Sequence, residues 1–386
     1  MKRERSKNMK SRFVVVTLLF LGCFPVFGQE VALNESLNET VQFVTKKGMF
    51  DIALETTIFK PEGAGPFPVA VINHGKALGD PRFQGRYRPF SAVHYFLQRG
   101  YAVVVPMRQG FSKSGGSYIG GGCNVESNGR VQAEDVKVVL EYVALQPWAD
   151  KEHVVVLGQS HGGWTALAFG TQNHPGVKGL VNFAGGLRQT GCPGWEKNLA
   201  RSAAGYAAET RLPSIWFYGD NDSYFNAETF HAMHAQYVAA GGNARLVAYG
   251  QFGSDSHALF GSRTGGAVWE PEVSSFLASI GLPHEPLAMH ARFAAAPLSG
   301  MPPRTDFATL EDESKLPFVK DAGRTGYKNY LTKSLPRAYA IAPNGAWAWA
   351  DGGDDPLKRS VDNCNKNGKG ECKLYSADNF VVWKSE

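Results

Sequence analysis

Residues 158–164, Gly-Gln-Ser-His-Gly-Gly-Trp, decide the fold, because they directly follow the apolar run His-Val-Val-Val-Leu at 153–157. Such an unbroken run is typical of a strand that is buried on both faces of a parallel sheet. A G-x-S-x-G motif between a buried strand and a helix predicts a sharp turn, which lifts Ser160 above the sheet edge at a helix N-terminus. Glycine on each side of the turn lets neighbouring backbone pass without a clash from a Cβ atom. Ser160 is therefore the candidate nucleophile.

Similar apolar runs lie on both sides of this turn and alternate with stretches of helical period. The strand-like runs are residues 69–73, 102–106, 153–157, 179–183, 214–218 and 244–248, and the helical stretches are 89–99, 131–146, 164–171, 227–240 and 267–279. Repeated strand–helix–strand units predict an α/β fold with a doubly wound, mostly parallel sheet. Residues 41–45 and 50–59 alternate in the manner of an antiparallel hairpin, which would form one edge of that sheet.

Residues 1–28 have the pattern of a secretory signal peptide, with a basic stretch, an apolar run and a cleavage region that ends in a small residue. The apolar run is shorter than the ~20 residues that a membrane-spanning helix needs. We therefore expect a secreted or periplasmic protein without an integral membrane segment, with a lipoprotein anchor at Cys23 as the alternative. The leader holds six basic residues and one acidic residue, so the rest of the chain is formally neutral. Neutrality removes the electrostatic case for a nucleic-acid partner.

The sequence divides into four parts. We expect the signal peptide at 1–28, a catalytic domain at 29–282, a linker rich in Pro, Ala and His at 283–325, and a small α+β module at 326–386. Residues 187–212 interrupt the strand–helix alternation and are the predicted place of a small cap. In the module, Asn344-Gly345 between two strand-like runs indicates a hairpin.

Four cysteines remain once Cys23 leaves with the leader, and an oxidising compartment favours disulfides between them. Of the three possible connectivities, proximity in the sequence favours Cys123–Cys192 and Cys364–Cys372. Because no CxxC or HExxH motif occurs, we expect neither a metal nor another cofactor.

The partners of Ser160 should follow it in the order acid, then base. The turn Gly-Asp-Asn-Asp at 219–222 supplies Asp222 as the acid, with Asp220 as the alternative. His257 lies in a loop one strand–helix–strand unit beyond Asp222 and is the candidate base. The oxyanion hole would take one amide from His161 and a second from Lys76, or alternatively from Gly75, in the loop after strand 69–73.

With these residues in place, residues 30–282 resemble the dienelactone hydrolase branch of the α/β-hydrolases. The resembling segments are 73–75, 107–116, 158–163, 219–222 and 256–257. Dienelactone hydrolases use cysteine as the nucleophile, so Ser160 points to carboxylic-ester hydrolysis instead of lactone hydrolysis. Residues 108–116 are also similar to the arginine-glycine loop of acyl-aminopeptidase-like and X-prolyl peptidases, although Gln109 interrupts the Arg-Gly pair. For Arg108 we expect a structural ion pair, with substrate binding as the alternative.

The sequence thus predicts a serine hydrolase that acts on a small-molecule or polymer ester through an acyl-enzyme on Ser160. Trp164 and the predicted cap would shape the substrate pocket. The alternatives are a serine peptidase of the same fold and a non-catalytic binding protein with a hydrolase scaffold.

Overall fold

The computed structural model describes residues 33–77, 79–262, 264–295, 300–333, 335–351 and 355–384. The predicted signal peptide, with Cys23, lies outside these ranges. None of the helices within them combines the length and the apolar character that crossing a membrane requires.

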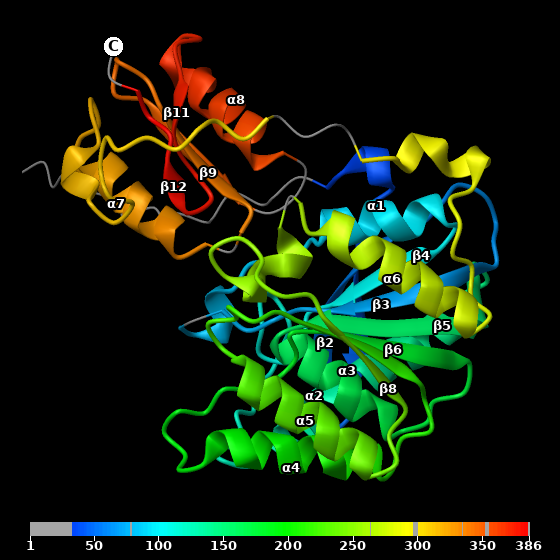
Figure 1. Ribbon diagram of the computed structural model, residues 1–386. Helices are drawn as coiled ribbons and strands as arrows, with labels where there is room; N and C mark the ends of the chain where they lie inside the picture. Colours follow the sequence, from blue (N-terminus) through cyan, green and yellow to red (C-terminus); the bar gives the residue numbers. More distant parts are fainter. Residues whose placement is uncertain are drawn as a thin grey trace, which may run out of the picture. The chain divides into compact units, whose positions relative to one another are not determined.

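An eight-stranded sheet organises the first part of the chain (Figure 1). In spatial order its strands are β1 (Thr40–Lys46), β2 (Ile52–Phe59), β4 (Ala102–Pro106), β3 (Phe67–Asn73), β5 (Ala149–Gln159), β6 (Val177–Phe183), β7 (Ser214–Tyr218) and β8 (Ala244–Ala248). The pairs β1–β2 and β2–β4 are antiparallel, and the remaining pairs are parallel. The predicted α/β fold with a mostly parallel sheet and an antiparallel edge is confirmed.

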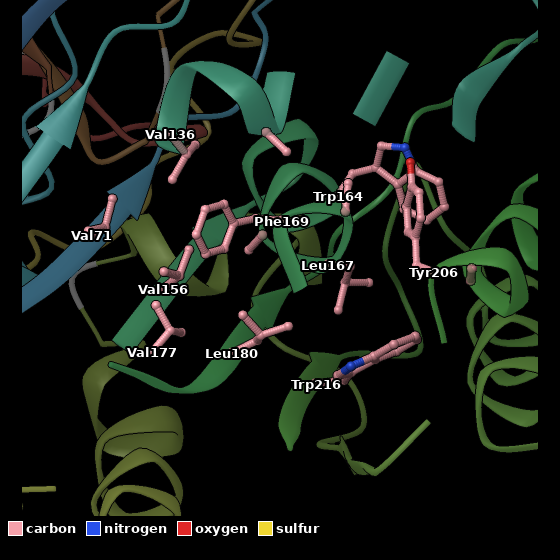
Figure 2. Packing of buried hydrophobic residues seen from close by; sticks show 14 of the residues in the cluster. Val71, Val136, Val156, Trp164, Leu167, Phe169, Val177, Leu180, Tyr206 and Trp216 are labelled. Carbon is pink, nitrogen blue, oxygen red and sulfur yellow. The ribbon is translucent and has the colours of Figure 1, made fainter. Parts of the chain in front are cut away.

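Helices cover both faces of this sheet. On one face lie α2 (Val125–Ala144), α3 (His161–Gly170), α4 (Trp195–Ala207) and α5 (Ala227–Ala239), and on the other lie α1 (Phe90–Gln98) and α6 (Gly266–Ser279). Successive strand residues point to opposite faces, so Val156 packs with the first set and Leu157 with the second. Figure 2 shows Val156 beside Phe169 in the first core. Full burial of each such side chain stabilises the fold by about 1.5–3 kcal/mol.

The predicted cap is wrong, because half of residues 187–212 form α4, the crossover helix between β6 and β7. The α4 side chains Leu199, Ala203 and Tyr206 are fully buried in the core that α2, α3 and α5 share. Polar residues on the outer face of α4 hide its helical period in the sequence. The segments 187–194 and 208–212 on either side of α4 lie outside regular structure.

The order β4-β3-β5 creates a switch point at the carboxyl ends of β3 and β5. From β3 the chain moves to one side to form β4 and then returns to the other side to form β5. Ligands of open α/β sheets bind in the crevice that such a reversal leaves. Asn73, at the end of β3, pairs with Gly158 near the end of β5. The loop at 74–76 and the turn at Ser160 therefore leave the sheet side by side.

The C-terminal part forms a second, four-stranded sheet in the order β10-β9-β11-β12, drawn in orange and red in Figure 1. Its elements are α7 (Asp321–Leu331), β9 (Arg337–Ile341), β10 (Trp347–Asp351), α8 (Pro356–Gly368), β11 (Lys373–Ala377) and β12 (Phe380–Val381). Trp347 stacks on Tyr339 with ring centroids 5.9 Å apart. This is the small α+β module that the sequence predicts.

The linker is shorter than the predicted 283–325. Phe293 is buried, and its carbonyl lies 2.7 Å from Nδ1 of His94 in α1, so the segment before residue 295 packs on the first sheet's helices. Leu316 and Val319 are buried with the core of the C-terminal module. The buried side chains of this segment have no regular spacing in the sequence. For that reason the sequence predicts a linker here and not a packed segment.

Both predicted disulfides are formed, Cys123–Cys192 and Cys364–Cys372. The first joins the residue before the N-cap of α2 to the loop at 187–194, and the second joins α8 to the residue before β11.

Candidate active site

Ser160 forms the turn between β5 and α3 in a backbone conformation that few residues with a side chain adopt, with φ +57° and ψ −126°. Its amide donates to the carbonyl of Phe183 at 2.9 Å, and its carbonyl accepts from the amide of Trp164 at 3.0 Å. Strain of this kind persists only where the surroundings hold it, and it gathers at active sites. The partly exposed side chain of Ser160 is thus held at the sheet edge.

The glycines of the motif are required by close backbone contacts. A Cβ atom built on Gly158 would lie 2.3 Å from the carbonyl carbon of Gly162, and one built on Gly162 would lie 2.1 Å from the carbonyl oxygen of Asn73. Both distances are far below van der Waals contact. Any side chain at these positions would force β5, β3 and α3 apart.

Asp222 and His257 form an acid–base pair. Nδ1 of His257 lies 3.0 Å from Oδ2 and 3.2 Å from Oδ1 of Asp222. The Asp222 side chain is fully buried, and its Oδ1 also accepts from the amides of Tyr224 and Phe225 at 2.8 and 2.9 Å. These bonds orient the carboxylate so that the imidazole carries its proton on Nδ1 and leaves Nε2 as an acceptor. The alternative acid, Asp220, is exposed and does not take this place.

The side chain of Gln159 connects this pair to the turn at Ser160. Nε2 of Gln159 donates to the carbonyl of His257 at 2.9 Å, which brings the loop of the base beside the residue that precedes Ser160. No hydrogen bond joins Ser160 Oγ to His257 in the described part of the chain. In free enzymes such bonds are often long and shorten when substrate binds.

Asp255 and Asn221 join the acid loop to the base loop, and the sequence analysis misses both residues. Asp255 Oδ1 accepts from the amides of His257 and Ser223 at 2.9 and 3.0 Å. Asn221 Oδ1 accepts from the amide of Phe252 at 3.0 Å, and its Nδ2 donates to the carbonyl of Gly253 at 3.2 Å. An Asp two residues before a candidate base is typical of an Asx-turn, and that spacing is the one signal the sequence offers.

The predicted oxyanion donors, the backbone amides of His161 and Lys76, belong to segments that lie next to Ser160. His161 is the first residue of α3, where amides lack acceptors within the helix. The loop at 74–76 passes the nucleophile closely, since a Cβ atom on Gly75 would lie 3.4 Å from Cβ of Ser160. Among the described residues, no acceptor bonds the amides of His161 or Lys76.

Behind this hole lies a buried polar network around His74, His161 and Arg108. Nη2 of Arg108 donates to Nδ1 of His161 at 3.1 Å, so the Nε2–H of His161 donates to Oδ1 of Asn128 at 2.7 Å. His74 accepts from the amide of Arg108 through Nε2 at 3.1 Å, and its Nδ1–H donates to the carbonyl of Gly75 at 2.7 Å. Burial, and then the charge of Arg108, lower the pKa of both imidazoles well below the usual value. Both histidines are therefore neutral at neutral pH.

The expected ion pair of Arg108 is absent. Within the described ranges no carboxylate lies at ion-pair distance from it, because the nearby Asp135 binds Lys46 at 2.6 Å. Arg108 is fully buried.

Aromatic and basic side chains surround the base and the oxyanion loop. The Tyr224 ring lies 4.4 Å from that of His257, and the guanidinium of Arg188 lies 5.9 Å from the Tyr224 ring. On the other side, Nζ of Lys76 lies 5.7 Å from the ring of Tyr118, and burial lowers the pKa of Lys76. Of the carboxylates in this region, Asp222 and Asp255 bond the two loops, Asp80 pairs with Arg82, and Asp220 is exposed.

Trp164 is not a pocket residue, contrary to the prediction. It is fully buried, its Nε1–H donates to the carbonyl of Val125 at 2.8 Å, and it packs on Tyr206, as Figure 2 shows. Four residues after Ser160 the helix has turned this side chain towards α2 and α4.

Residues 48–213 match the family model of X-Pro dipeptidyl-peptidases of the S15 family. The matched segment contains Ser160 but ends before Asp222 and His257. A comparison with curated protein sequences gave no match.

Several solved structures are similar at low identity. A puromycin-hydrolysing peptidase of Mycobacterium tuberculosis is 18% identical with a TM-score of 0.47, over 63% of this chain and 39% of its own. The acylaminoacyl peptidase of Pyrococcus horikoshii is 17% identical with a TM-score of 0.48, over 66% and 44%. The esterase of Pyrococcus furiosus is 16% identical with a TM-score of 0.47, over 65% and 96%. The chain thus spans about two-fifths of the length of the first two proteins.

The sheet order and the strained serine turn are those of the α/β-hydrolase fold, and the family match over the part that carries Ser160 indicates a hydrolase. Within that class the chain is similar to peptidases of the S15 family over the part that carries Ser160.

Proposed function

We propose that the protein is an exported serine hydrolase that cleaves carboxylic esters through an acyl-enzyme on Ser160. The observation that carries the proposal is the Asp222–His257 pair, which Gln159 holds beside the strained Ser160 turn. Nε2 of His257 takes the proton of the Ser160 hydroxyl while Oγ attacks the ester carbonyl. Asp222 stabilises the imidazolium that results.

The amides of His161 and Lys76 donate to the oxyanion of the tetrahedral intermediate, and each such donor lowers the barrier by about 3 kcal/mol. His257 then returns the proton to the departing alcohol, which leaves the acyl group on Ser160. A water molecule, deprotonated by His257, attacks this acyl-enzyme in a second tetrahedral step. Release of the carboxylic acid restores the free serine.

A serine peptidase is the second candidate, and the S15 family match favours it. An enzyme that removes residues from a peptide N-terminus must bind an ammonium group, for which a carboxylate is the ordinary partner. Near Tyr224 and Tyr118 lie instead the cations Arg188 and Lys76, and Asp80, the carboxylate that acts on Lys76, is paired with Arg82. This charge pattern supports an ester substrate without a free amino group.

The proposal of export depends on the leader pattern at residues 1–28 and on the two disulfides, since disulfides persist in oxidising compartments. Mass spectrometry of the mature N-terminus from a culture fraction tests it. A chain that still begins with Met1 contradicts export.

Labelling with a fluorophosphonate probe tests the enzymatic proposal. We expect the wild type to be labelled and Ser160→Ala to be unlabelled. Ser112→Ala is the matched control, because Ser112 also has positive φ, at +52°, in a loop after β4. An unlabelled wild type would favour a non-catalytic binding protein.

The rates of hydrolysis of two chromogenic substrates distinguish the esterase proposal from the peptidase proposal. Hydrolysis of p-nitrophenyl acetate without release of p-nitroaniline from Gly-Pro-p-nitroanilide supports the esterase. Faster cleavage of the anilide supports the peptidase.

A further inference from the structure

Arg108 is a buried cation without a carboxylate partner, two residues beyond the end of β4. Its Nε donates to Oε1 of Gln132 at 3.2 Å, and its Nη2 donates both to the carbonyl of His74 at 2.8 Å and to Nδ1 of His161 at 3.1 Å. In the part of the chain that is described, Nη1 is buried without a hydrogen-bond partner. Burial lowers the pKa of Arg108 to about 10, so the side chain is charged at neutral pH.

Such a placement is costly for the fold. Taking a charge out of water costs several kcal/mol unless an opposite charge and hydrogen bonds compensate it. Here the hydrogen bonds go to three neutral acceptors, which are the carbonyl of His74, the ring of His161 and the side chain of Gln132, while the charge of Asp135 acts without a direct bond. A guanidinium is suited to this task because it is a planar donor that can bond several acceptors in fixed directions.

The two acceptors of Nη2 belong to the two halves of the predicted oxyanion hole. His74 begins the loop at 74–76, which supplies the amide of Lys76. His161 supplies the other amide, and its ring is fixed on its far side by Asn128. The amide of Arg108 also bonds Nε2 of His74, so the side chain and the main chain of Arg108 hold the same loop.

We propose that Arg108 is a positioning residue, which sets the separation of the two oxyanion donors by bonding His74 on one side and His161 on the other. This inference rests on the proposed function, because it presupposes that the amides of His161 and Lys76 stabilise an oxyanion. Arg108 itself does not touch the substrate. A change at Arg108 should therefore affect the step in which negative charge develops on the carbonyl oxygen of the substrate. It should not affect the binding of the uncharged ester.

The test compares Arg108→Lys with the wild type in three measurements: kcat and KM for p-nitrophenyl acetate, the inhibition constant of phenylboronic acid, and the temperature of unfolding. A single ammonium group cannot reproduce the contact of Nε with Gln132 together with the contacts of Nη2 with His74 and His161 in the fixed directions of a planar guanidinium. We expect kcat to fall about 10- to 100-fold with KM nearly unchanged, since misplacement by about 1 Å has effects of that size. Phenylboronic acid forms a tetrahedral adduct with a serine, so its affinity should fall by a similar factor.

Arg99→Lys is the matched control. Arg99 is also a buried arginine that bonds main-chain carbonyls, those of His284 and Tyr95 at 2.8 and 2.9 Å, but it lies at the end of α1. Arg99→Lys should lower the unfolding temperature without changing kcat or the affinity for phenylboronic acid.

Gln132→Met is a second variant in case Arg108→Lys does not fold, because it removes one acceptor of Arg108 and leaves the oxyanion loops untouched. It should lower kcat in the same direction by a smaller factor. The inference is overturned if the folded variants keep wild-type kcat and phenylboronic acid affinity. An unlabelled wild type in the fluorophosphonate test would instead overturn the proposed function.

Discussion

Oδ1 of Asp255 lies 2.9 Å from the amide nitrogen of His257, and the same carboxylate bonds the amide and the hydroxyl of Ser223. The loops that carry His257 and Asp222 are therefore held together by Asp255 as well as by Asn221. This arrangement holds the imidazole of His257 beside Asp222.

Asp255→Ala should lower kcat for p-nitrophenyl acetate about 10- to 100-fold, because His257 would lose the anchor of its main chain. KM should change little, since Asp255 does not face the substrate. Asp150→Ala is the control: Asp150 makes the same type of turn, with the amide of Glu152 at 3.0 Å, far along the chain from these loops. Equal losses of activity in both variants would contradict this role.

Asp222→Asn should reduce kcat about 10³- to 10⁴-fold, because an amide at this place favours the wrong tautomer of the base. The neighbouring Asp220→Asn should leave kcat within about twofold of the wild type, since Asp220 is exposed and does not bond His257. Steady-state kinetics of the two variants measure this. A larger loss of kcat in Asp220→Asn than in Asp222→Asn would indicate that Asp220 is the acid.

The stability of the protein should fall as the pH falls below about 6.5, the usual pKa of histidine. Burial lowers the pKa of His74 and of His161, so the unfolded chain binds protons that the folded chain does not. The free energy of unfolding should therefore decrease by up to about 1.4 kcal/mol per pH unit for each of the two histidines. Urea unfolding at pH 7, 6 and 5 measures the slope.

His161→Gln should make this slope shallower by the contribution of one histidine. His153→Gln, which removes an imidazole from the half-exposed ion pair with Asp150, is the control. A slope that both variants leave unchanged would assign the acid sensitivity to other groups.

Loss of the Cys123–Cys192 disulfide should destabilise the protein more than loss of Cys364–Cys372. The first spans 69 residues of sequence and the second 8. The chain-entropy relation gives about 4 kcal/mol for the longer span and about 2.5 kcal/mol for the shorter. Urea unfolding of the two double Cys→Ser variants compares them, and an equal or inverted loss contradicts the entropic account.

Much of the fold is predictable because parallel strands covered on both faces are continuous apolar runs, as residues 102–106 are. Helix α2 is harder to delimit. It begins at Val125 and not at residue 131, since Asn124 caps it through the amide of Ser127 at 2.9 Å. Its buried Asn128 and Gln132 serve the network around His161 and Arg108 and interrupt the apolar period.

The candidate site is predictable where chemistry is tied to a local pattern, as in the turn at Ser160 and the order of Asp222 and His257. The contacts of Arg108 and Asp255 depend on loops that meet only in the folded chain, so no local pattern indicates them. Trp164 shows the opposite error, because nearness in sequence to Ser160 does not determine which side of α3 a residue occupies.

The bond from Gln159 to the carbonyl of His257 joins two assemblies that are otherwise built from different stretches of chain. One assembly carries the serine and the oxyanion donors, and the other carries the acid and the base. The distance between His257 and Asp222 is thus set within one assembly, whereas the distance between Ser160 and His257 is set across the contact that Gln159 makes between the two.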